Sequence, residues 1–289
     1  MTQTSTKRLR LLTVGNSFAD NATAYLRQIA QAAGYELVLC RANIGGCSLE
    51  QHWKLAEAYE ADPAAATGKP YAHPVKGQPN ISLREALALE SWDFVTIQQY
   101  SVLCTDVATY RPYAGKLAAY IKQYAPQAEV LLHQTWAYRN DDPRFTDGKE
   151  NADSMYRGLV QAYSAIAREL GVRQIPVGDA FHLVTTHPRF TYTPDTAFDF
   201  AHAVYPAVPN QTHSLHAGWR WGKDAAGQYQ LSMDGHHANK TGEYLGGLVF
   251  FERLTGVSAL GNSFVPPGIS TTDARILQEI AQQVVQAVK

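Results

Sequence analysis

The 289-residue sequence is poor in the features that mark several large classes of protein. Its 25 Lys and Arg residues nearly balance its 26 Asp and Glu residues, and the formal net charge is −1. Such a balance leaves no basic footprint for a nucleic acid or an anionic membrane. No segment approaches the roughly 20 consecutive apolar residues of a membrane-spanning helix. We therefore expect a globular domain with neither a nucleic-acid partner nor a membrane partner.

Cysteine is scarce as well. Cys40, Cys47 and Cys104 make an odd number without a CxxC pair, so they predict neither a disulfide framework nor a zinc site. The chain also lacks the HExxH pattern of zinc proteases, internal repeats and low-complexity tracts. We therefore expect no cofactor.

The first residues combine basic side chains with an apolar run, as a signal peptide does. Lys7, Arg8 and Arg10 come before or beside residues 11–14, but this run ends at Gly15. It has about four residues, fewer than the ~7–15 of a signal's apolar core. We interpret it as a first strand, which predicts a cytoplasmic protein, or a secreted or periplasmic one if a signal has been removed from the chain.

What the sequence does contain is a regular alternation of apolar runs and amphipathic segments. The runs that predict strands are 11–14, 35–43, 92–99, 128–134 and 172–178. The segments that predict helices include 22–33, 109–124, 151–170 and 271–288. A strand–helix alternation of this kind predicts an α/β protein with a five-stranded parallel sheet between two helical layers.

Two segments interrupt this alternation. Residues 61–80 are rich in Pro, Gly and Ala, and residues 186–231 hold four Pro, four His and two Trp without clear periodicity. We interpret both as insertions in a single domain that spans residues 1–289. A connection as long as the second is usually functional, so it is a candidate lid.

A serine follows the first predicted strand directly. Ser17 lies in the turn GNSF, where open parallel sheets place their ligands, just past the carboxyl end of a strand. A serine at this position is a candidate nucleophile, although serines in such turns also serve as helix caps. A nucleophile needs a base, an orienting acid and donors for an oxyanion.

The segment DGHH supplies the base and the acid. Asp234 and His237 stand three residues apart just before a predicted helix. Groups at i and i+3 of a helical turn share a face, so the carboxylate can hold the imidazole in one tautomer, whereas His236 would point elsewhere. Serine, histidine and aspartate form acyl-transfer triads, which are recognised by geometry and not by chain order.

Taken together, these motifs resemble the SGNH (GDSL-like) hydrolases. GNSFAD stands in place of the commoner GDSL block, Gly45-Gly46 matches the second block, and Asp234 to His237 matches the final D-x-x-H pair. The family's three-layer sandwich around a five-stranded parallel sheet, a flavodoxin-like fold, agrees with the predicted strands. The resemblance implies a serine esterase in which the backbone N–H groups of Ser17 and Gly46 bind the oxyanion.

The third block departs from the family pattern, which supplies an Asn from a G-x-N-D turn. This chain has Gln98 and Gln99 instead. A Gln amide is the same donor on a stem one methylene longer, and carbohydrate acetylesterases of the sialate type are similar in using Gln there. We favour Gln98 as third oxyanion donor over Gln99, which alternation places on the opposite face. A Gln that only binds loop backbone is the alternative.

Aromatic residues are abundant, with 16 Tyr, 10 Phe and 5 Trp. We expect Trp219 or Trp221 to face the Ser17 pocket, where a flat ring suits the C–H face of a sugar. Trp136 is interpreted as a pocket wall or as core, and His52 as a pocket residue or a satisfied surface histidine. The substrate we expect is therefore a small-molecule or saccharide ester, such as an O-acetylated sugar.

Three alternatives stay open. A lipase or thioesterase would need a continuous apolar channel. A carbohydrate-binding pseudoenzyme would keep the fold without turnover. A metal-dependent hydrolase would use some of the residues His202, His213, His216, His236, His237, Asp199 and Asp234. The GNSF pattern recurs at 261–264 without a preceding strand, so Ser263 is interpreted as a loop residue. The acyl group, the sugar and the oligomeric state are not specified by these patterns.

Overall fold

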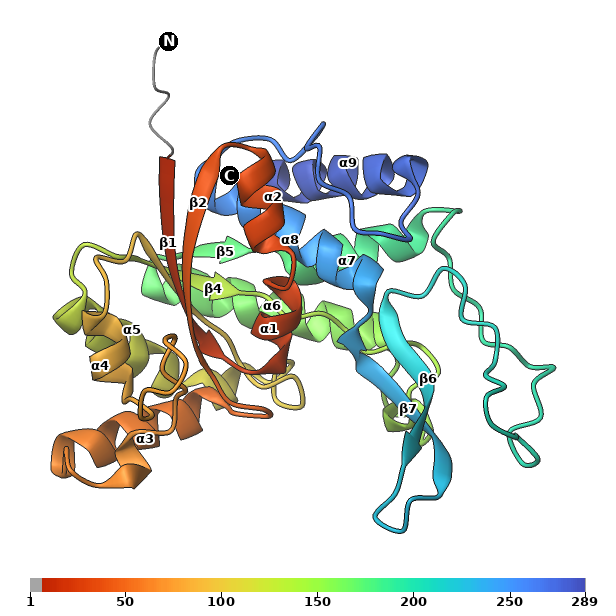
Figure 1. Cartoon of the computed structure of the whole chain (residues 1–289), viewed down its shortest axis with the longest axis horizontal. Helices are drawn as coiled ribbons and strands as arrows, with labels where there is room; N and C mark the ends of the chain where they lie inside the picture. Colours follow the sequence, from red (N-terminus) through yellow and green to blue (C-terminus); the bar gives the residue numbers. More distant parts are fainter. Residues whose placement is uncertain (1–6, 289) are drawn as a thin grey trace.

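A parallel sheet of five strands forms the middle layer of the molecule. The computed structural model describes residues 7–288. The strands are β1 (Lys7–Gly15), β2 (Tyr35–Asn43), β3 (Phe94–Ile97), β4 (Glu129–His133) and β5 (Arg173–Ile175). They pair in parallel in the order β2-β1-β3-β4-β5 (Figure 1). Each coincides with a predicted strand, so the parallel α/β fold is confirmed.

Helices cover both faces of this sheet (Figure 1). One layer consists of α1 (Ser17–Ala22), α2 (Leu26–Ala32), α7 (Val177–Thr186), α8 (Lys240–Thr255) and α9 (Thr271–Ala287). The other consists of α3 (Leu49–Ala61), α4 (Leu83–Ala88), α5 (Tyr113–Tyr124) and α6 (Ala152–Leu170). Short 3₁₀ turns occur at Ala66–Gly68, Val107–Tyr110 and Pro143–Phe145. The three-layer sandwich is therefore confirmed as well.

The predicted helix over 22–33 is divided in the structure. The chain leaves α1 at Thr23, whose hydroxyl donates to the carbonyl of Ala19 (2.7 Å), and α2 begins at Leu26. Such a side-chain bond competes with the helical backbone ladder and favours a helix end. The division leaves α1 as a separate short helix that begins at Ser17.

Helix α8 sits in the core and approaches α1 closely. Nearly all of its side chains from Gly242 to Leu254 are buried. A Cβ at Gly246 would lie 2.8 Å from the Cα of Ala22, so only glycine allows this separation. The contact brings the start of α8, next to His237, towards the helix that carries Ser17.

The two insertions differ in structure. Residues 61–80 run over the surface and form one bridge, Tyr71 with Ile81. The expectation of an irregular 186–231 segment is only partly right, because its end forms a hairpin of β6 (His216–Lys223) and β7 (Tyr229–Ala238). This hairpin projects from the sandwich (Figure 1).

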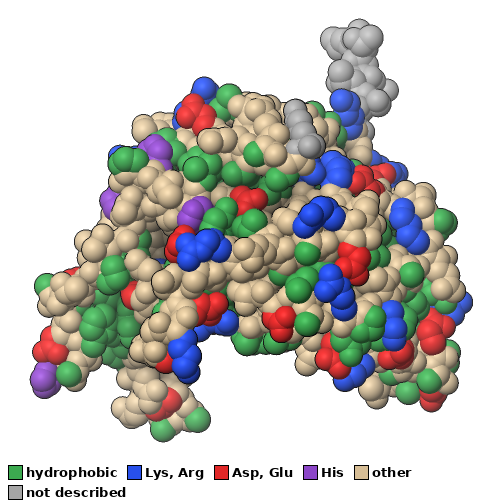
Figure 2. All heavy atoms as spheres, turned by 180° about the vertical axis from the view of Figure 1, so that it is seen from behind, with side chains coloured by type: hydrophobic (Ala, Val, Ile, Leu, Met, Phe, Trp, Pro, Cys, Tyr) green, Lys and Arg blue, Asp and Glu red, His purple; other side chains and the backbone are tan. Residues whose placement is uncertain are grey.

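The surface agrees with the balanced composition. Lys and Arg are interspersed with Asp and Glu over the face in Figure 2, without a large area of one sign. Among the helices of residues 7–288, none combines the length and apolarity that crossing a bilayer requires.

Candidate active site

Ser17 is the first residue of α1 and follows the carboxyl end of β1. Asn16 caps the helix, because its side-chain oxygen accepts the N–H of Phe18 (3.1 Å). Strand β1 lies between β2 and β3, and the chain switches sides of the sheet here, which is where open α/β sheets bind ligands. Ser17 is half-buried at this edge.

The structure brings the three predicted triad residues together. Nε2 of His237 lies 2.8 Å from Oγ of Ser17, although the two residues are 220 positions apart. Nδ1 of His237 lies 3.0 Å from Oδ2 and 3.1 Å from Oδ1 of Asp234. An ionised carboxylate only accepts, so the proton is on Nδ1, and Nε2 is free to accept from the serine hydroxyl. This is the arrangement of a general base on a nucleophile.

The Asp–His pair forms differently from the predicted helical turn. Residues 234–238 belong to β7, where Asp234 pairs with Gly218 and Ala238 with His216. Strand β7 therefore advances four residues while β6 advances two, which is a β-bulge. The bulge curls the strand, so that the backbone N–H of His237 also reaches Asp234 (3.1 Å). The proximity was predicted correctly, but its local structure was not.

Asp234 is buried and densely hydrogen-bonded. Burial by itself raises the pKa of its carboxyl group, but the bonds from the His237 side chain and backbone outweigh it, so the pKa lies well below its usual range. Nη2 of Arg220 also reaches Oδ2 (2.8 Å), and Nδ1 of His236 lies 3.4 Å from Oδ1. The lowered pKa keeps Asp234 ionised at neutral pH. The pKa of the neighbouring His236 is also lowered, first by burial and then by repulsion from His237.

The cluster around Asp234 also bears on the alternative of a metal-dependent hydrolase. In the described part of the chain, the group of residues close enough to share an ion is Asp234, His236 and His237. Both ring nitrogens of His237 already face Asp234 and Ser17, so an ion would have to displace a triad contact. His216 binds the carbonyl of Ala137 (3.0 Å), and His202 pairs with Asp199 on the exposed insertion. The donor set fits a triad better than a metal site.

The predicted oxyanion donors are the backbone N–H groups of Ser17 and Gly46. Gly46 lies in the turn after β2 with φ +66°, a conformation that favours glycine. A Cβ there would come within 3.7 Å of the Tyr100 ring. In the chain from residue 7 to 288, the N–H groups of Ser17 and Gly46 have no hydrogen-bond partner. Both are suited to bind an oxyanion.

Gln98 belongs to a chain of buried hydrogen bonds across the sheet edge. Asn16 accepts the Phe18 N–H at Oδ1, so its Nδ2 donates to the carbonyl of Cys47 (3.0 Å). Gln98 must then give Nε2 to Asn16 Oδ1 (2.8 Å) and receive Nδ1–H of His133 at Oε1 (2.9 Å). Burial lowers the pKa of His133 to about 3, so this ring is neutral.

This series of hydrogen bonds gives Gln98 a role that the sequence did not suggest. Through Asn16, Gln98 links the serine turn to the Gly46 turn, while one hydrogen of Nε2 remains for a further acceptor. Gln99 is more fully committed. Its oxygen accepts from the N–H groups of Leu49 (3.1 Å) and Tyr100 (2.9 Å), and its nitrogen donates to Thr109. Gln99 thus matches the alternative of a Gln that binds loop backbone.

His52 and Trp136 are buried residues that bond backbone carbonyls next to the site. His52 is fully buried, with Nε2 on the Gly15 carbonyl (2.9 Å) and Nδ1 on the Tyr71 hydroxyl (2.8 Å). Burial lowers its pKa to about 4. Trp136 is also fully buried and donates Nε1 to the carbonyl of His236 (2.8 Å). Neither residue can touch a substrate, because both lie beneath the surface.

The two tryptophans of the hairpin lie away from Ser17. The Trp219 ring packs 4.7 Å from Phe200, and Nε1 of Trp221 donates to the carbonyl of Ala207 (2.8 Å). Arg220, between them, points to the opposite face and reaches Asp234. The structure therefore corrects the expectation that a tryptophan faces the Ser17 pocket.

Several site residues were missed from the sequence. Asn21 of α1 accepts the N–H of Ala238 (3.0 Å), next to His237. Tyr138 lies 5.3 Å from the ring of His236 and bonds Ser101 (2.8 Å). Only Asn16 carried a signal, since Asn is a preferred helix cap. Ser263 lies in an exposed loop, as predicted.

A cavity of about 280 Å³ lies near the site but does not include Ser17 or His237. It is bordered by the segment after β4 and by α6, α7 and the start of the insertion. Phe181 lines it and stacks on Trp136 (4.4 Å), which in turn packs on Phe18 (4.4 Å). These rings form a wall between the cavity and the triad.

Comparisons with solved structures agree with the fold. A DUF4886 family protein from Bacteroides uniformis ATCC 8492 has a TM-score of 0.72 at 24% identity, covering 97% of this chain and 95% of that one. This likeness shows a shared fold.

Two further structures are more distant. A protein from Slackia heliotrinireducens, provisionally assigned as an SGNH hydrolase, has a TM-score of 0.49 at 19% identity, covering 85% of this chain and 98% of that one. A protein from Parabacteroides merdae ATCC 43184, provisionally assigned as a GDSL-like lipase, has a TM-score of 0.48 at 15% identity, covering 86% of this chain and 96% of that one.

No curated protein matches the chain. A family model does, and it covers residues 10–199, which include the Ser17, Gly46 and Gln98 segments. Because this model, the domain of unknown function DUF4886, matches more than half of the chain, the protein belongs to the DUF4886 family.

Proposed function

We propose that the protein is a serine esterase of the SGNH type that hydrolyses small acyl esters. The observation that carries the proposal is the unbroken series of hydrogen bonds from Ser17 through His237 to Asp234. The free N–H groups of Ser17 and Gly46 support it, because an acyl-transfer site also needs donors for the oxyanion.

The reaction would proceed in two steps. Oγ of Ser17 attacks the ester carbonyl carbon while its proton passes to Nε2 of His237, and Asp234 stabilises the imidazolium. The carbonyl oxygen becomes an oxyanion between the N–H groups of Ser17 and Gly46, each worth roughly 3–4 kcal/mol in the transition state. The C–O bond then breaks, and His237 returns the proton to the leaving alcohol.

Water completes the cycle. His237 takes a proton from a water molecule, whose oxygen attacks the acyl group on Ser17. The second tetrahedral intermediate collapses as His237 returns this proton to Oγ of Ser17, which breaks the bond between Oγ and the acyl carbon, releases the carboxylic acid and restores the serine hydroxyl. We keep Gln98 as a proposed third donor, through its remaining Nε2 hydrogen, in addition to its contact with Asn16.

For the substrate, we infer a short acyl group on a polar alcohol, such as a carbohydrate. The side chains that flank Asp234 at the surface are polar, since Arg220 and His236 expose 63% and 37% of their side-chain area. A long acyl chain would need an apolar channel at Ser17, and the cavity of about 280 Å³ lies behind the Phe18–Trp136–Phe181 wall. This geometry favours a carbohydrate ester over a lipid or thioester.

A serine-reactive phosphonate with peptide mapping tests the reaction class. We expect label on Ser17 and none on Ser263, the exposed serine of the second GNSF segment. Ser17→Ala should lower turnover of a chromogenic acetate ester by at least ~10³-fold, whereas Ser263→Ala should leave it unchanged. Binding of a sugar ester without turnover by the unmutated protein would instead indicate a pseudoenzyme.

A further inference from the structure

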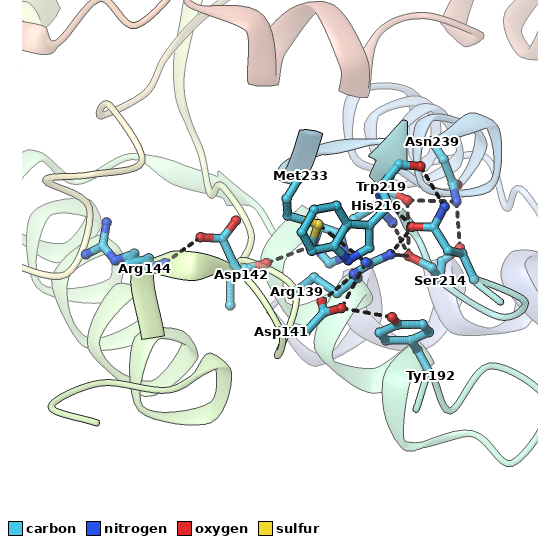
Figure 3. A network of polar contacts seen from close by, with 12 residues as sticks. Arg139, Asp141, Asp142, Arg144, Tyr192, Ser214, His216, Trp219, Met233 and Asn239 are labelled. Carbon is cyan, nitrogen blue, oxygen red and sulfur yellow. Dashed lines mark hydrogen bonds and ion pairs between the residues drawn. The ribbon is translucent and has the colours of Figure 1, made fainter. Parts of the chain in front are cut away.

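Arg139 is a buried arginine that the proposed mechanism does not use. It follows β4 in the segment 134–142, and only 2% of its side-chain area is exposed. A buried guanidinium needs partners for all its donors. Asp141 binds it with two bonds (2.6 and 3.0 Å), and the Tyr192 ring lies 4.4 Å from the guanidinium carbon. Figure 3 shows these partners around Arg139.

The other donors of Arg139 reach both strands of the β6–β7 hairpin. On β7, its backbone N–H binds the carbonyl of Gly235 (2.8 Å). Its Nη2 reaches Sδ of Met233 (3.4 Å), which lies beside it in Figure 3. These two residues lie directly before and after Asp234. Arg139 therefore holds the strand on each side of the triad carboxylate.

On β6, the shorter connection passes through Gln211, and a longer one passes through Oγ of Ser214 (3.4 Å from Nη1), which bonds His216. Nη1 of Arg139 donates to Oε1 of Gln211 (2.8 Å), which also accepts the N–H of Trp219 (2.6 Å). Nε2 of Gln211 donates to the carbonyl of Trp219 (2.8 Å). Gly218, with φ +70°, permits this contact, because a Cβ there would lie 2.3 Å from Nη1.

We propose that Arg139 is a positioning residue that fixes Asp234 against His237 by holding both strands of the β6–β7 hairpin to the core. The inference rests on the proposed function, since it assigns the carboxylate to the triad. The hairpin projects from the sandwich, and the bulge that curls 234–237 is held by Arg139 on one side and by Asn21 on the other. Without the guanidinium, residue 139 keeps only its backbone bond to Gly235, and the contacts with Met233 and Gln211 are lost, so that the bulge can relax and the carboxylate can move from Nδ1.

The experiment compares three variants with the unmutated protein. Arg139→Met removes the guanidinium, Gln211→Ala removes the link to β6 that passes through Gln211, and Arg253→Met is the matched control. Arg253 is also buried but binds the carbonyls of Gln174 (2.7 Å) and Val288 (3.1 Å), away from the hairpin. We would measure kcat and KM on a chromogenic acetate ester, the rate of phosphonate labelling at Ser17, and the unfolding midpoint.

We expect Arg139→Met to lower kcat and the labelling rate by about 10–100-fold with KM changed less than about threefold, because the triad geometry is disturbed and substrate contacts are not. Gln211→Ala should act in the same direction by about threefold or more. Arg253→Met should lower the unfolding midpoint by an amount similar to Arg139→Met while kcat stays unchanged.

Two results would overturn the proposal. One is a folded Arg139→Met protein whose kcat and rate of Ser17 labelling equal those of the unmutated protein. The other is an Arg253→Met protein whose kcat falls by the same factor, because the loss would then follow stability. If Arg139→Met does not fold, the test rests on Gln211→Ala. A Gln211→Ala protein whose kcat equals that of the unmutated protein then refutes the positioning role of Arg139. Absence of Ser17 labelling in the unmutated protein refutes the proposed function itself, so the two failures are distinguishable.

Discussion

Replacing Asp234 by Asn is the most demanding test of the triad. The two side chains have the same shape, and the amide oxygen can still accept the N–H of His237. Its NH₂ group, however, then faces Nδ1, which must become an acceptor. The imidazole proton moves to Nε2 and points at Ser17, so His237 can no longer take the serine proton.

The expected loss can be given a magnitude. An imidazole held in the wrong tautomer costs about 10⁴-fold in kcat, which corresponds to about 5.5 kcal/mol of transition-state stabilisation. Some stability is lost as well, because the folded state favours the ionised carboxylate, as its lowered pKa shows, but the matched shape of Asn and the exposure of Arg220 leave the fold in place. We therefore expect a folded protein that binds the ester with near-normal KM and hardly turns it over.

The chain offers a matched control. Asp199 and His202 repeat the same local pattern, with Nδ1 of His202 at 2.8 Å from Asp199 and the His202 N–H on the same carboxylate, but on the exposed insertion. Asp199→Asn should leave kcat unchanged. The assay is steady-state hydrolysis of a chromogenic acetate ester with circular dichroism of both variants. A folded Asp234→Asn protein that retains kcat within tenfold of normal would refute the triad.

Three further predictions concern the same residues. His237→Ala should abolish turnover as Ser17→Ala does, whereas His236→Ala should reduce kcat by less than tenfold, and the opposite ranking in a kinetic assay would reassign the base. Gln98→Glu should lower both the unfolding midpoint and kcat, because a carboxylate would face Asn16 Oδ1 and the oxyanion; an unchanged midpoint in thermal denaturation would contradict the assigned contact. The pKa of Asp234 is lowered in the folded state, so its contribution to stability is present above the unfolded pKa of about 3.9 and is lost as pH falls below it. The difference in unfolding midpoint between the unmutated protein and Asp234→Asn should therefore shrink from pH 7 to pH 3, and a constant difference would show that the carboxylate is not held as described.

The sequence was sufficient for the sheet and for the three residues, Ser17, Asp234 and His237, that the structure brings together as the proposed triad. The strands are buried apolar runs, and Ser17 follows the first of them, so chain order alone places it at the carboxyl edge. The spacing of Asp234 and His237 predicted their proximity, but a helical turn and a bulge both bring i and i+3 together. Only the pairing of β6 with β7 distinguishes the two.

Other parts of the site depend on contacts that leave no local pattern. Glycines at 218 and 222 interrupt the alternation of β6, so the hairpin was not predicted, and without its register the side that Trp219 and Trp221 face could not be known. Arg139 lies in a connecting segment, where an arginine is ordinarily exposed. Its burial arises from the insertion, which folds over it from more than 50 residues further along the chain.

The distance of 220 residues between Ser17 and His237 has a consequence for the protein during its synthesis. The proposed nucleophile therefore leaves the ribosome well before its proposed base. In the proposed mechanism, Ser17 is an ordinary alcohol until β7 is made and seated, because His237 is not yet there to take its proton. Chemical competence appears together with the completed sandwich, because α8, which follows His237 directly, must pack on α1 to close the serine–histidine contact.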